Sequence, residues 1–437
     1  MRIIVKNVTL VDGLTVKEDH DLYIKDGVIA CISPCISPIK VNSDDIEESH
    51  VVQIIDGAGK IAFPGFVNAH THLSMVLFRG LADDLPLKEW LEKEIWPIEK
   101  NLKPQEVYWF ALLGIAEMIR SGTTAFADMY FYMDEVARAV EESGMRALLA
   151  CGIIAESYDA HGRKEIETAR NLIVDWHGKA NGRINVALAP HAPYTCGCEI
   201  LEKTRDIAVS AGVMIHTHLS ETADEVKRSY ADLGMSPVKY LASLDLFSVP
   251  ILAAHCVHVN EEDIALLAEH NVMVVHNPTS NAKLASGIAP VMQMKAVGVN
   301  VALGTDGAAS NNNLDMLEEM RLATLLQKVT TKDPTTIPAI EALRMATCSG
   351  ATAIGIGELA GTLTVGKRAD IVLMDIDKVN MLPSYDYISD LVYAANSQAI
   401  TDVIVDGQIV MERGNLTTID EERVKAKARE LSVGYRK

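Results

Sequence analysis

Long apolar runs are missing from this sequence of 437 residues. A membrane-spanning helix needs about 18 or more apolar residues in a row, and the most apolar runs, such as residues 249–257, are interrupted by residues like His255. Residues 1–7 also lack the apolar segment and small-residue cleavage site of a secretory signal. These absences exclude a membrane-spanning protein and predict a cytoplasmic one.

Basic residues are too few for a polyanion-binding protein. The chain has 40 Lys and Arg against 59 Asp and Glu, and its net charge of -19 repels phosphate backbones. Nucleic acid is therefore not an expected partner. Seven cysteines, an odd number in a long chain, do not indicate a disulfide framework. The close pairs Cys31/Cys35 and Cys196/Cys198 lack second pairs at zinc-finger spacing, which argues against a structural zinc site.

Both ends of the chain have a β-rich pattern within a globular composition of 49% apolar and 23% charged residues. Short apolar runs occur at residues 3–5, 9–11, 21–24, 28–30, 369–374, 403–405 and 408–410. Turn pairs such as Asp26-Gly27 and Asp406-Gly407 separate them. We predict a small β-sandwich built from both termini. Residues 1–60 form its N-terminal part, and residues 356–437 form its C-terminal part plus a terminal helix.

The middle of the chain, residues 61–355, alternates apolar strands with amphipathic helices, which is typical of a parallel sheet. Eight strand candidates occur there, at residues 66–73, 123–129, 147–154, 184–191, 214–221, 251–257, 272–278 and 301–307. A helix is predicted over Pro104–Arg120, where apolar residues recur at helical spacing. Eight such strands fit a (β/α)8 TIM-like barrel. A doubly wound open sheet is the alternative, which the absence of a Gly-rich phosphate loop disfavours.

Several predicted strands end in metal-binding residue types, although a buried parallel strand is expected to be apolar. The first strand ends in Asn68-Ala69-His70-Thr71-His72, and the two-residue period of a strand points both imidazoles to one face. The later strand ends carry His191, His216, His218, Glu221, His255 and Asp306. The carboxyl ends of barrel strands meet at one mouth. Three imidazoles, a carboxylate and an open position for water form a catalytic zinc environment, so we predict a metal site there.

Two further histidines have alternative interpretations. His216 faces the same way as His218, so it is either a ligand or, as we favour from its deeper position in the strand, a hydrogen-bonded core residue. His276, before Asn277-Pro278, is either a support for the metal ligands or the loop anchor that we favour.

Five motifs carry a family resemblance. They are Pro64-Gly65-Phe66-Val67-Asn68-Ala69-His70-Thr71-His72, His218-Leu219-Ser220-Glu221, His255-Cys256-Val257, His276-Asn277-Pro278-Thr279-Ser280-Asn281 and Gly304-Thr305-Asp306-Gly307. Together they resemble the amidohydrolase superfamily over essentially the whole chain. Within it, residues 91–99 and 189–196 are most similar to the 5'-methylthioadenosine/S-adenosylhomocysteine deaminases and the methanogen 5'-deoxyadenosine deaminases.

The resemblance implies a metal-dependent hydrolase that deaminates an adenine nucleoside to its inosine analogue and ammonia. It implies one divalent metal per subunit, usually zinc, with the ligands His70, His72, His218 and Asp306. It also implies that Glu99 contacts the ribose hydroxyls, that His191 contacts the purine, and that Glu221 and Asp306 touch the substrate. A small-molecule nucleoside and a second copy of the chain in a homo-oligomer are the expected partners.

Deamination of adenine needs hydroxide at C6, a proton for N1 and a proton for the departing ammonia. A bound metal lowers the pKa of water towards about 7. Glu221 is the expected shuttle for the proton that reaches N1. Asp306 is expected to pass the second proton to the amine, while His255 orients the attacking oxygen and stabilises the developing charge.

The substrate is less well defined by the sequence. A carboxylate at Glu99 in a chain of net charge -19 disfavours nucleotides, so nucleosides without charge at the 5' position fit better. Thioadenosine-type relatives often carry an arginine near the end of the third strand, where this chain has Ala150-Cys151-Gly152. Arg146 and Arg163 are the candidates to replace it as the partner of a homocysteine carboxylate.

Other activities remain open, because a metal constellation does not identify the leaving group. Guanine deamination, triazine hydrolysis and cyclic amide cleavage are the enzymatic alternatives. A non-catalytic metal-binding scaffold is the alternative from another class. Such a scaffold is expected to have lost Glu221 or Asp306, and both residues are present.

Overall fold

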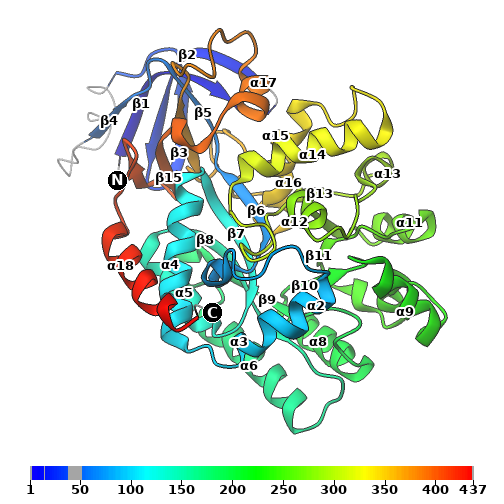
Figure 1. Cartoon of the computed structure of the whole chain (residues 1–437). Coiled ribbons are helices and arrows are strands. Elements are labelled where there is room, and N and C mark those ends of the chain that lie inside the picture. Colours follow the sequence, from blue (N-terminus) through cyan, green and yellow to red (C-terminus); the bar gives the residue numbers. More distant parts are fainter. Residues whose placement is uncertain (1, 14, 38–51, 436–437) are drawn as a thin grey trace.

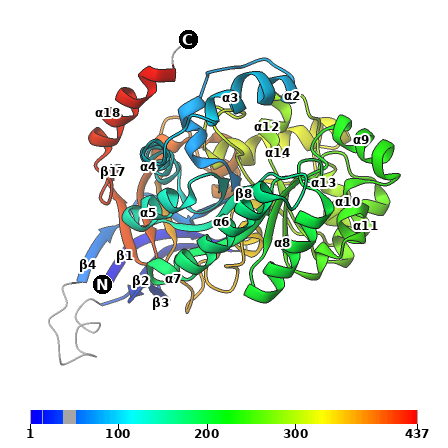
Figure 2. The same ribbon diagram turned by 90° about the horizontal axis from the view of Figure 1, so that it is seen from below.

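The computed structural model describes residues 2–13, 15–37 and 52–435. A barrel of parallel strands surrounded by helices makes up the larger part, and a mixed sheet from both ends of the chain lies against one side of it (Figure 1, Figure 2). The predicted fold class is therefore confirmed. In the described ranges, no helix has the length and apolar character needed to cross a membrane.

Eight parallel strands form the barrel and lie side by side in chain order. They are β6 (Phe66–Thr71), β7 (Thr123–Tyr130), β8 (Arg146–Ile153), β9 (Ile184–Pro190), β10 (Ile215–Leu219), β11 (Ile251–His255), β12 (Met273–His276) and β13 (Val301–Leu303). The last strand meets the first where the Asp306 amide donates to the His70 carbonyl over 3.0 Å. At this closure a Cβ on Gly304 would lie 2.8 Å from the His70 backbone, so glycine permits the close approach. All eight predicted strands are present, and their sequential order excludes the doubly wound alternative.

Helices surround the barrel and connect its strands. They are α4 (Pro104–Arg120), α5 (Met133–Ser143), α6 (Ala160–Trp176), α7 (Lys179–Gly182), α8 (Cys198–Ala211), α9 (Ala223–Leu233), α10 (Pro237–Ser243), α11 (Glu261–Glu269), α12 (Pro278–Lys283), α13 (Val291–Ala296), α14 (Met316–Thr331), α15 (Ala339–Ala346) and α16 (Cys348–Ala353). Helix α4 has the predicted bounds. Proline occupies its first turn, Glu106 accepts from the Lys103 amide over 2.8 Å, and Gly122 follows its end at φ 84°.

A long connection between β6 and α4 covers the mouth of the barrel. It contains the short helices η1 (Leu73–Phe78), α2 (Leu87–Glu89), η2 (Trp90–Ile95) and α3 (Trp96–Glu99). Trp90 and Ile95 are buried in it. This connection brings Trp96 and Glu99 to the pocket at the barrel mouth.

The terminal sheet interleaves strands from the two ends of the chain. Its strands are β1 (Arg2–Val11), β2 (Val16–Lys25), β3 (Val28–Ser33), β4 (Val52–Asp56), β5 (Lys60–Pro64), β14 (Ile371–Asp375), β15 (Ile400–Val405), β16 (Gln408–Glu412) and β17 (Asn415–Leu416). Strand β5 lies between β1 and β14, so the N-terminal and C-terminal strands belong to one hydrogen-bonded sheet. Both sets of strands contribute to one apolar cluster.

The N-terminal strands differ from the sequence prediction in detail. The runs at residues 3–5 and 9–11 belong to one strand, β1, whose pairing shifts near Asn7, where φ is 55°. Strands β4 and β5 were not predicted. We propose the division into residues 1–60, 61–355 and 356–437 as the domain organisation, although β5 extends the terminal sheet to Pro64.

Contacts at two places join the terminal sheet and the end of the described chain to the barrel. The Arg146 guanidinium donates to Asp370 over 3.0 Å and to Asp406 over 3.2 Å, and Arg146 and Asp370 are buried. Helix α18 (Glu421–Ser432) runs beside α4 (Figure 2). Beyond it the Tyr435 hydroxyl donates to Glu106 over 2.8 Å.

Candidate active site

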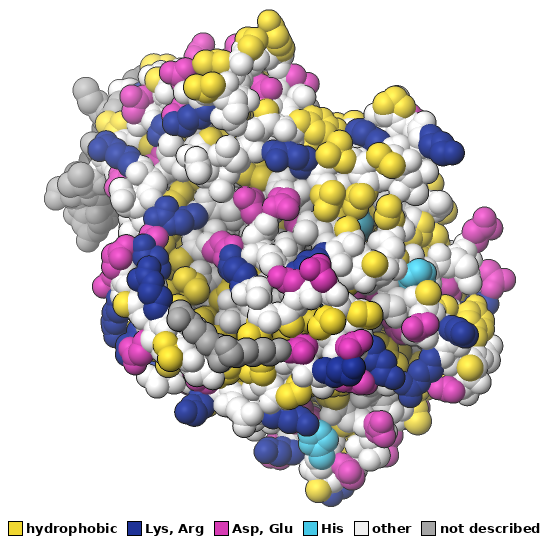
Figure 3. Space-filling view, in the orientation of Figure 1, with side chains coloured by type: hydrophobic (Ala, Val, Ile, Leu, Met, Phe, Trp, Pro, Cys, Tyr) yellow, Lys and Arg dark blue, Asp and Glu magenta, His cyan; other side chains and the backbone are white. Residues whose placement is uncertain are grey.

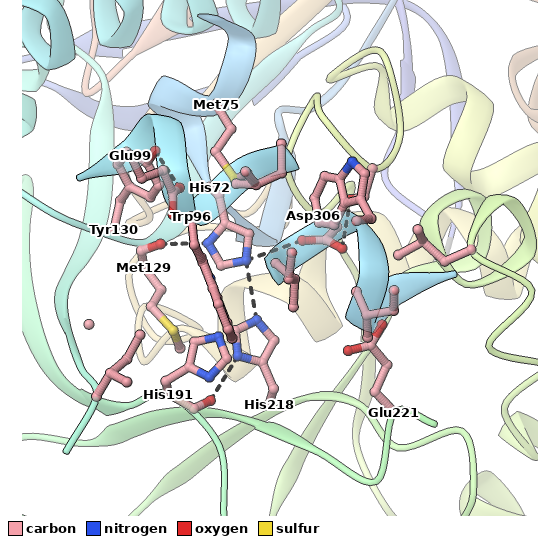
Figure 4. Close-up of a pocket in the computed structure, with 18 of the residues that line it drawn as sticks. His72, Met75, Trp96, Glu99, Met129, Tyr130, His191, His218, Glu221 and Asp306 are labelled. Atoms are coloured by element: carbon pink, nitrogen blue, oxygen red, sulfur yellow. Dashed lines mark hydrogen bonds and ion pairs between the residues drawn. The ribbon is translucent and has the colours of Figure 1, made fainter. Parts of the chain in front are cut away.

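One pocket opens at the carboxyl ends of the barrel strands and extends beneath the β6–α4 connection, with a volume of about 730 Å³ including its mouth. Seven of the eight predicted site residues line it: His72, Glu99, His191, His218, Glu221, His255 and Asp306. His70 is fully buried, and its ring centroid lies 4.9 Å from those of His72 and His218. The structure therefore brings together residues that are far apart in sequence (Figure 4).

Hydrogen bonds to carbonyl groups fix the tautomers of two histidines. His72 Nδ1 lies 2.6 Å from the Met129 carbonyl oxygen, and His218 Nδ1 lies 2.8 Å from the carbonyl oxygen of His191. A carbonyl only accepts, so each Nδ1 carries a proton, and the neutral form of each ring has its lone pair on Nε2. The two Nε2 atoms face each other at 3.2 Å. A cation between them would relieve the repulsion of two lone pairs.

His70 supplies a third nitrogen at the same place. Its Nδ1 lies 2.8 Å from Nε2 of His216, which is buried below it in β10. Burial lowers the pKa of His70 to about 4, so the ring is neutral near pH 7. Its Nε2 is buried and has no hydrogen-bond partner in the described part of the chain. His216 thus has the core hydrogen bond that we favoured, and it supports His70.

Asp306 presents one carboxylate oxygen to the histidines and has the other occupied. Oδ1 lies 3.5 Å from His70 Nε2 and 3.3 Å from His72 Nε2. Oδ2 accepts hydrogen bonds from the hydroxyls of Ser280, at 2.6 Å, and Ser310, at 2.9 Å. Burial alone would raise the pKa of Asp306, but the neighbouring imidazoles lower it well below its ordinary value. The carboxylate is therefore ionised and oriented.

These donor atoms fit a divalent transition metal. One ligand nitrogen from each of His70, His72 and His218 lies within 4.8 Å of the others, and the same holds for the ligand atoms of His70, His255 and Asp306. Three imidazoles and a carboxylate form a set that zinc accepts while keeping a position open. The unpartnered His70 nitrogen and the opposed lone pairs of His72 and His218 are structural reasons for a cation at this point.

His255 and Glu221 lie beside this cluster. His255 Nδ1 donates to Asn281 Oδ1 over 2.8 Å, and its Nε2 lies 3.8 Å from Glu221 Oε2. Burial would lower the pKa of His255, but Glu221 and Asp306 raise it above the ordinary value. Burial raises the pKa of Glu221, against the opposing effect of His255. A carboxyl group with a raised pKa next to a histidine is suited to proton transfer.

Glu99 lies at the other side of the pocket. It ends α3, and the Tyr130 hydroxyl from β7 donates to its Oε1 over 2.7 Å (Figure 4). Burial raises the pKa of Glu99 to about 7, although the hydrogen bond from Tyr130 opposes the shift. Glu99 is therefore not the surface carboxylate that its place in a polar helical segment would suggest.

His191 lines the same pocket and lies beside His218. Its ring centroid is 4.6 Å from that of His218, and its Nδ1 lies 3.1 Å from the Thr195 hydroxyl. Since the Thr195 hydroxyl donates to the Ala192 carbonyl over 3.1 Å, it accepts from His191. The Nδ1 atom then carries a proton, and the Nε2 atom is an acceptor.

Several supporting residues were not identified from the sequence. Asn281, Ser280 and Ser310 hold His255 and Asp306, and Tyr130 holds Glu99. Asn281 and Ser280 lie in the His276–Asn281 motif. The sequence does not show that this segment folds against His255 and Asp306.

The structure also places three residues for which the sequence suggested alternative roles, Arg146, Arg163 and His276. Arg146 is in the buried ion pairs below the barrel, and neither Arg146 nor Arg163 lines the pocket. Neither is therefore placed to receive a homocysteine carboxylate. His276 is buried, and both of its ring nitrogens lack hydrogen-bond partners among the described residues, so the structure does not bear out its interpretation as a loop anchor.

The family model for amidohydrolases matches residues 61–410. The chain belongs to the amidohydrolase family. Among its relatives, the 5-methylthioadenosine/S-adenosylhomocysteine deaminase of Pelotomaculum thermopropionicum is 48% identical over 426 residues, which cover 97% of this chain and 98% of the relative. The match includes both the barrel and most of the terminal sheet.

Two solved structures have the same fold. An adenosine deaminase from Xanthomonas campestris with bound zinc superposes with a TM-score of 0.92 at 35% identity, covering 99% of this chain and 98% of the other. The atrazine chlorohydrolase of Arthrobacter aurescens, also complexed with zinc, gives a TM-score of 0.89 at 25% identity and covers 98% and 100%. One fold and a zinc site thus occur with different substrates, so the assignment of a substrate depends on the pocket.

Proposed function

We propose that this protein is a metal-dependent deaminase of adenine nucleosides, which converts them to inosine analogues and ammonia. The observation that supports the proposal best is the arrangement of the pocket. Glu221 and His255 lie near Asp306 at one end, and the half-buried carboxylate Glu99 lies at the other end beside Tyr130. The 48% identity to a methylthioadenosine/S-adenosylhomocysteine deaminase over nearly the whole chain agrees with it.

His70, His72, His218 and Asp306 would hold the metal, which we propose to be one zinc ion per chain. When bound, such an ion activates water near neutral pH. Glu221 accepts the proton of the attacking water and donates it to N1 of the adenine. Asp306 passes the second proton to the leaving amine. Imidazolium character at His255, supported by Asn281, orients the oxygen that attacks C6 and stabilises the negative charge on it.

The remaining residues would bind the nucleoside. His191, with an acceptor Nε2, contacts the purine, and Glu99 accepts hydrogen bonds from the ribose hydroxyls. Apolar side chains such as Trp90, Leu91 and Ile154 form the rest of the wall, and no Lys or Arg is among the described residues that line the pocket. A neutral, apolar 5' substituent fits this wall better than a charged amino acid or a phosphate.

The wider setting is also part of the proposal. We place the protein in the cytoplasm as a homo-oligomer, with small-molecule nucleosides and not nucleic acid as its partners. On the face drawn in Figure 3, Lys and Arg side chains are interspersed with Asp and Glu. The net charge of -19 further disfavours phosphate backbones.

A substrate comparison tests the proposed function. Ammonia release is measured for 5'-deoxyadenosine, methylthioadenosine, S-adenosylhomocysteine, adenosine, guanine and a chlorotriazine, and kcat/KM values are compared. We expect turnover of the adenine nucleosides, with 5'-deoxyadenosine and methylthioadenosine ahead of S-adenosylhomocysteine because the pocket wall lacks a cation. Turnover of only guanine or only the triazine, the latter followed as chloride release, would replace the proposal with that activity. A preference for S-adenosylhomocysteine would reject the proposed 5' specificity.

The variant Glu99→Gln tests the ribose contact. Each charge-assisted hydrogen bond contributes about 1.5 to 3 kcal/mol, so the variant should lower kcat/KM for 5'-deoxyadenosine at least about tenfold. The loss should be much smaller for the analogue without 2'- and 3'-hydroxyls, because that substrate never makes the contact. Equal losses for both sugars would contradict the assignment.

Two controls accompany this variant. Glu92→Gln changes an exposed carboxylate of the same connection and should leave both substrates unaffected. The pH dependence is the second control. Because the pKa of Glu99 is about 7, its acceptor form increases as the pH rises through neutrality. Discrimination in favour of the ribose hydroxyls should therefore grow with pH in the native enzyme and stay constant in Glu99→Gln.

A further inference from the structure

Glu225 is a buried carboxylate that the proposed chemistry does not use. It lies in the first turn of α9 and is 8% exposed. Its Oε1 accepts from the Ser220 amide over 3.0 Å, and its Oε2 accepts from the Glu221 amide over 2.7 Å. Both oxygens are thus bonded to consecutive backbone groups of the turn that carries Glu221.

This contact is not an ordinary helix cap. Thr222 is the N-cap of α9, and its hydroxyl accepts from the Glu225 amide over 3.2 Å. In the usual capping box, the acidic residue three positions on would accept from the amide of the N-cap residue itself. Glu225 instead reaches past Thr222 to the two preceding amides. The turn it holds has Ser220 at φ 51°, a left-handed conformation that costs free energy for a non-glycine residue.

The side chain of Glu221 has few contacts that could hold it in place. Oε1 lies 3.4 Å from the Ser286 hydroxyl, and Oε2 lies 3.8 Å from His255 Nε2. Neither is a short hydrogen bond. The position of this carboxylate therefore depends on its backbone, and Glu225 holds both backbone amides of the turn by hydrogen bonds.

We propose that Glu225 is a positioning residue for proton transfer, because it holds the Ser220–Glu221 turn in the conformation that directs Glu221 into the active site. The inference rests on the proposed function, in which Glu221 moves protons. A displacement of a catalytic group by about 1 Å can cost about 100-fold in rate. Glu225 affects the reaction through Glu221 and does not touch the substrate.

The variant Glu225→Gln tests this role. The glutamine side chain can accept a hydrogen bond from only one of the two backbone N–H groups. Its NH2 group is a donor and would face the other N–H. We expect kcat to fall about 10- to 100-fold while KM changes less than about threefold and the metal content is unchanged. In a Glu221→Gln background the same substitution should cost almost nothing further, because the group being positioned is already disabled. Additive losses, or kcat within about threefold of the native value, would overturn the proposal.

Asp263→Asn is the matched control. Asp263 occupies the same position in the first turn of α11, is buried, and accepts from the Asn260 amide over 3.1 Å. Its hydrogen-bond partners, Asn260 and Ser236, are not residues of the proposed site. This variant should lose thermal stability as Glu225→Gln does, yet keep its kcat. A comparable loss of kcat in both variants would indicate a merely structural role for Glu225.

Hydrogen exchange gives a readout without turnover. In the metal-free protein, the amides of Ser220 and Glu221 should exchange at least about tenfold faster in Glu225→Gln than in the native chain. Unchanged exchange would overturn the proposal even if activity fell. If the native enzyme deaminates no nucleoside, the proposed function is wrong. The exchange rates of the two amides still test whether Glu225 holds the Ser220–Glu221 turn.

Glu225→Asp provides a second variant if Glu225→Gln does not fold. It keeps the negative charge, but its shorter side chain withdraws the carboxylate from the two amides. We expect at least about a tenfold loss of kcat with KM nearly unchanged. A folded Glu225→Asp enzyme with native kcat would reject the positioning role.

Discussion

Removal of the bound metal is expected to abolish turnover and to lower the thermal stability of the protein. Three imidazoles and the ionised Asp306 converge at one point, where His72 Nε2 lies 3.2 Å from His218 Nε2. Without the ion, water near the pocket keeps a pKa of about 15.7 instead of about 7, so turnover should fall by at least about 1000-fold. Zinc added back should restore it. An ion that binds only the folded chain also stabilises it, by about 2.7 kcal/mol at 100 times its Kd.

Two histidine variants make this experiment specific. His72→Ala removes a proposed ligand and should leave less than one metal per chain by elemental analysis. His270→Ala removes an exposed histidine at the end of α11 and should bind the metal normally. Full activity in a preparation that elemental analysis shows to be metal-free would refute the metal-dependent mechanism.

The barrel could be predicted from the sequence because its signals are local. Each strand is a short apolar run followed by a helix, and the eight runs coincide with β6 to β13. The terminal sheet was predicted only in part, since strand β5 pairs with β1 and with β14, which is about 300 residues away along the chain. The shifted pairing of β1 near Asn7 also depends on its partner strand, and a run of apolar residues does not encode it.

The residues of the site were predictable to different extents. Strand-end histidines indicated the convergence of His70, His72 and His218 because all barrel strands open at one mouth. Glu99 could be placed only through family resemblance, since its helix gives no signal that it is folded over the pocket towards Tyr130. Glu225 belongs to a visible Thr-x-x-Glu capping pattern, but the atoms that it binds depend on the left-handed turn at Ser220.

Glu221→Gln is expected to lower kcat by about two to four powers of ten, the usual contribution of a general acid-base group. The amide is nearly isosteric, so it should keep the contact with Ser286 and leave the fold and metal content unchanged. It can neither accept the proton of the attacking water nor deliver one to N1. Steady-state kinetics and elemental analysis on the same preparation separate a loss of proton transfer from a loss of metal.

The neighbouring carboxylate Asp224 provides the comparison for this variant. It lies three residues further along the chain, is exposed in the first turn of α9, and is not among the described residues that line the pocket. Asp224→Asn makes the same change of charge and should retain native kcat. If Glu221→Gln also keeps near-native kcat with its metal bound, the proton must travel through another group, and Asp306 or His255 would take over the role. Because Glu225 is proposed to act through Glu221, that result would also remove the chemical basis for its positioning role.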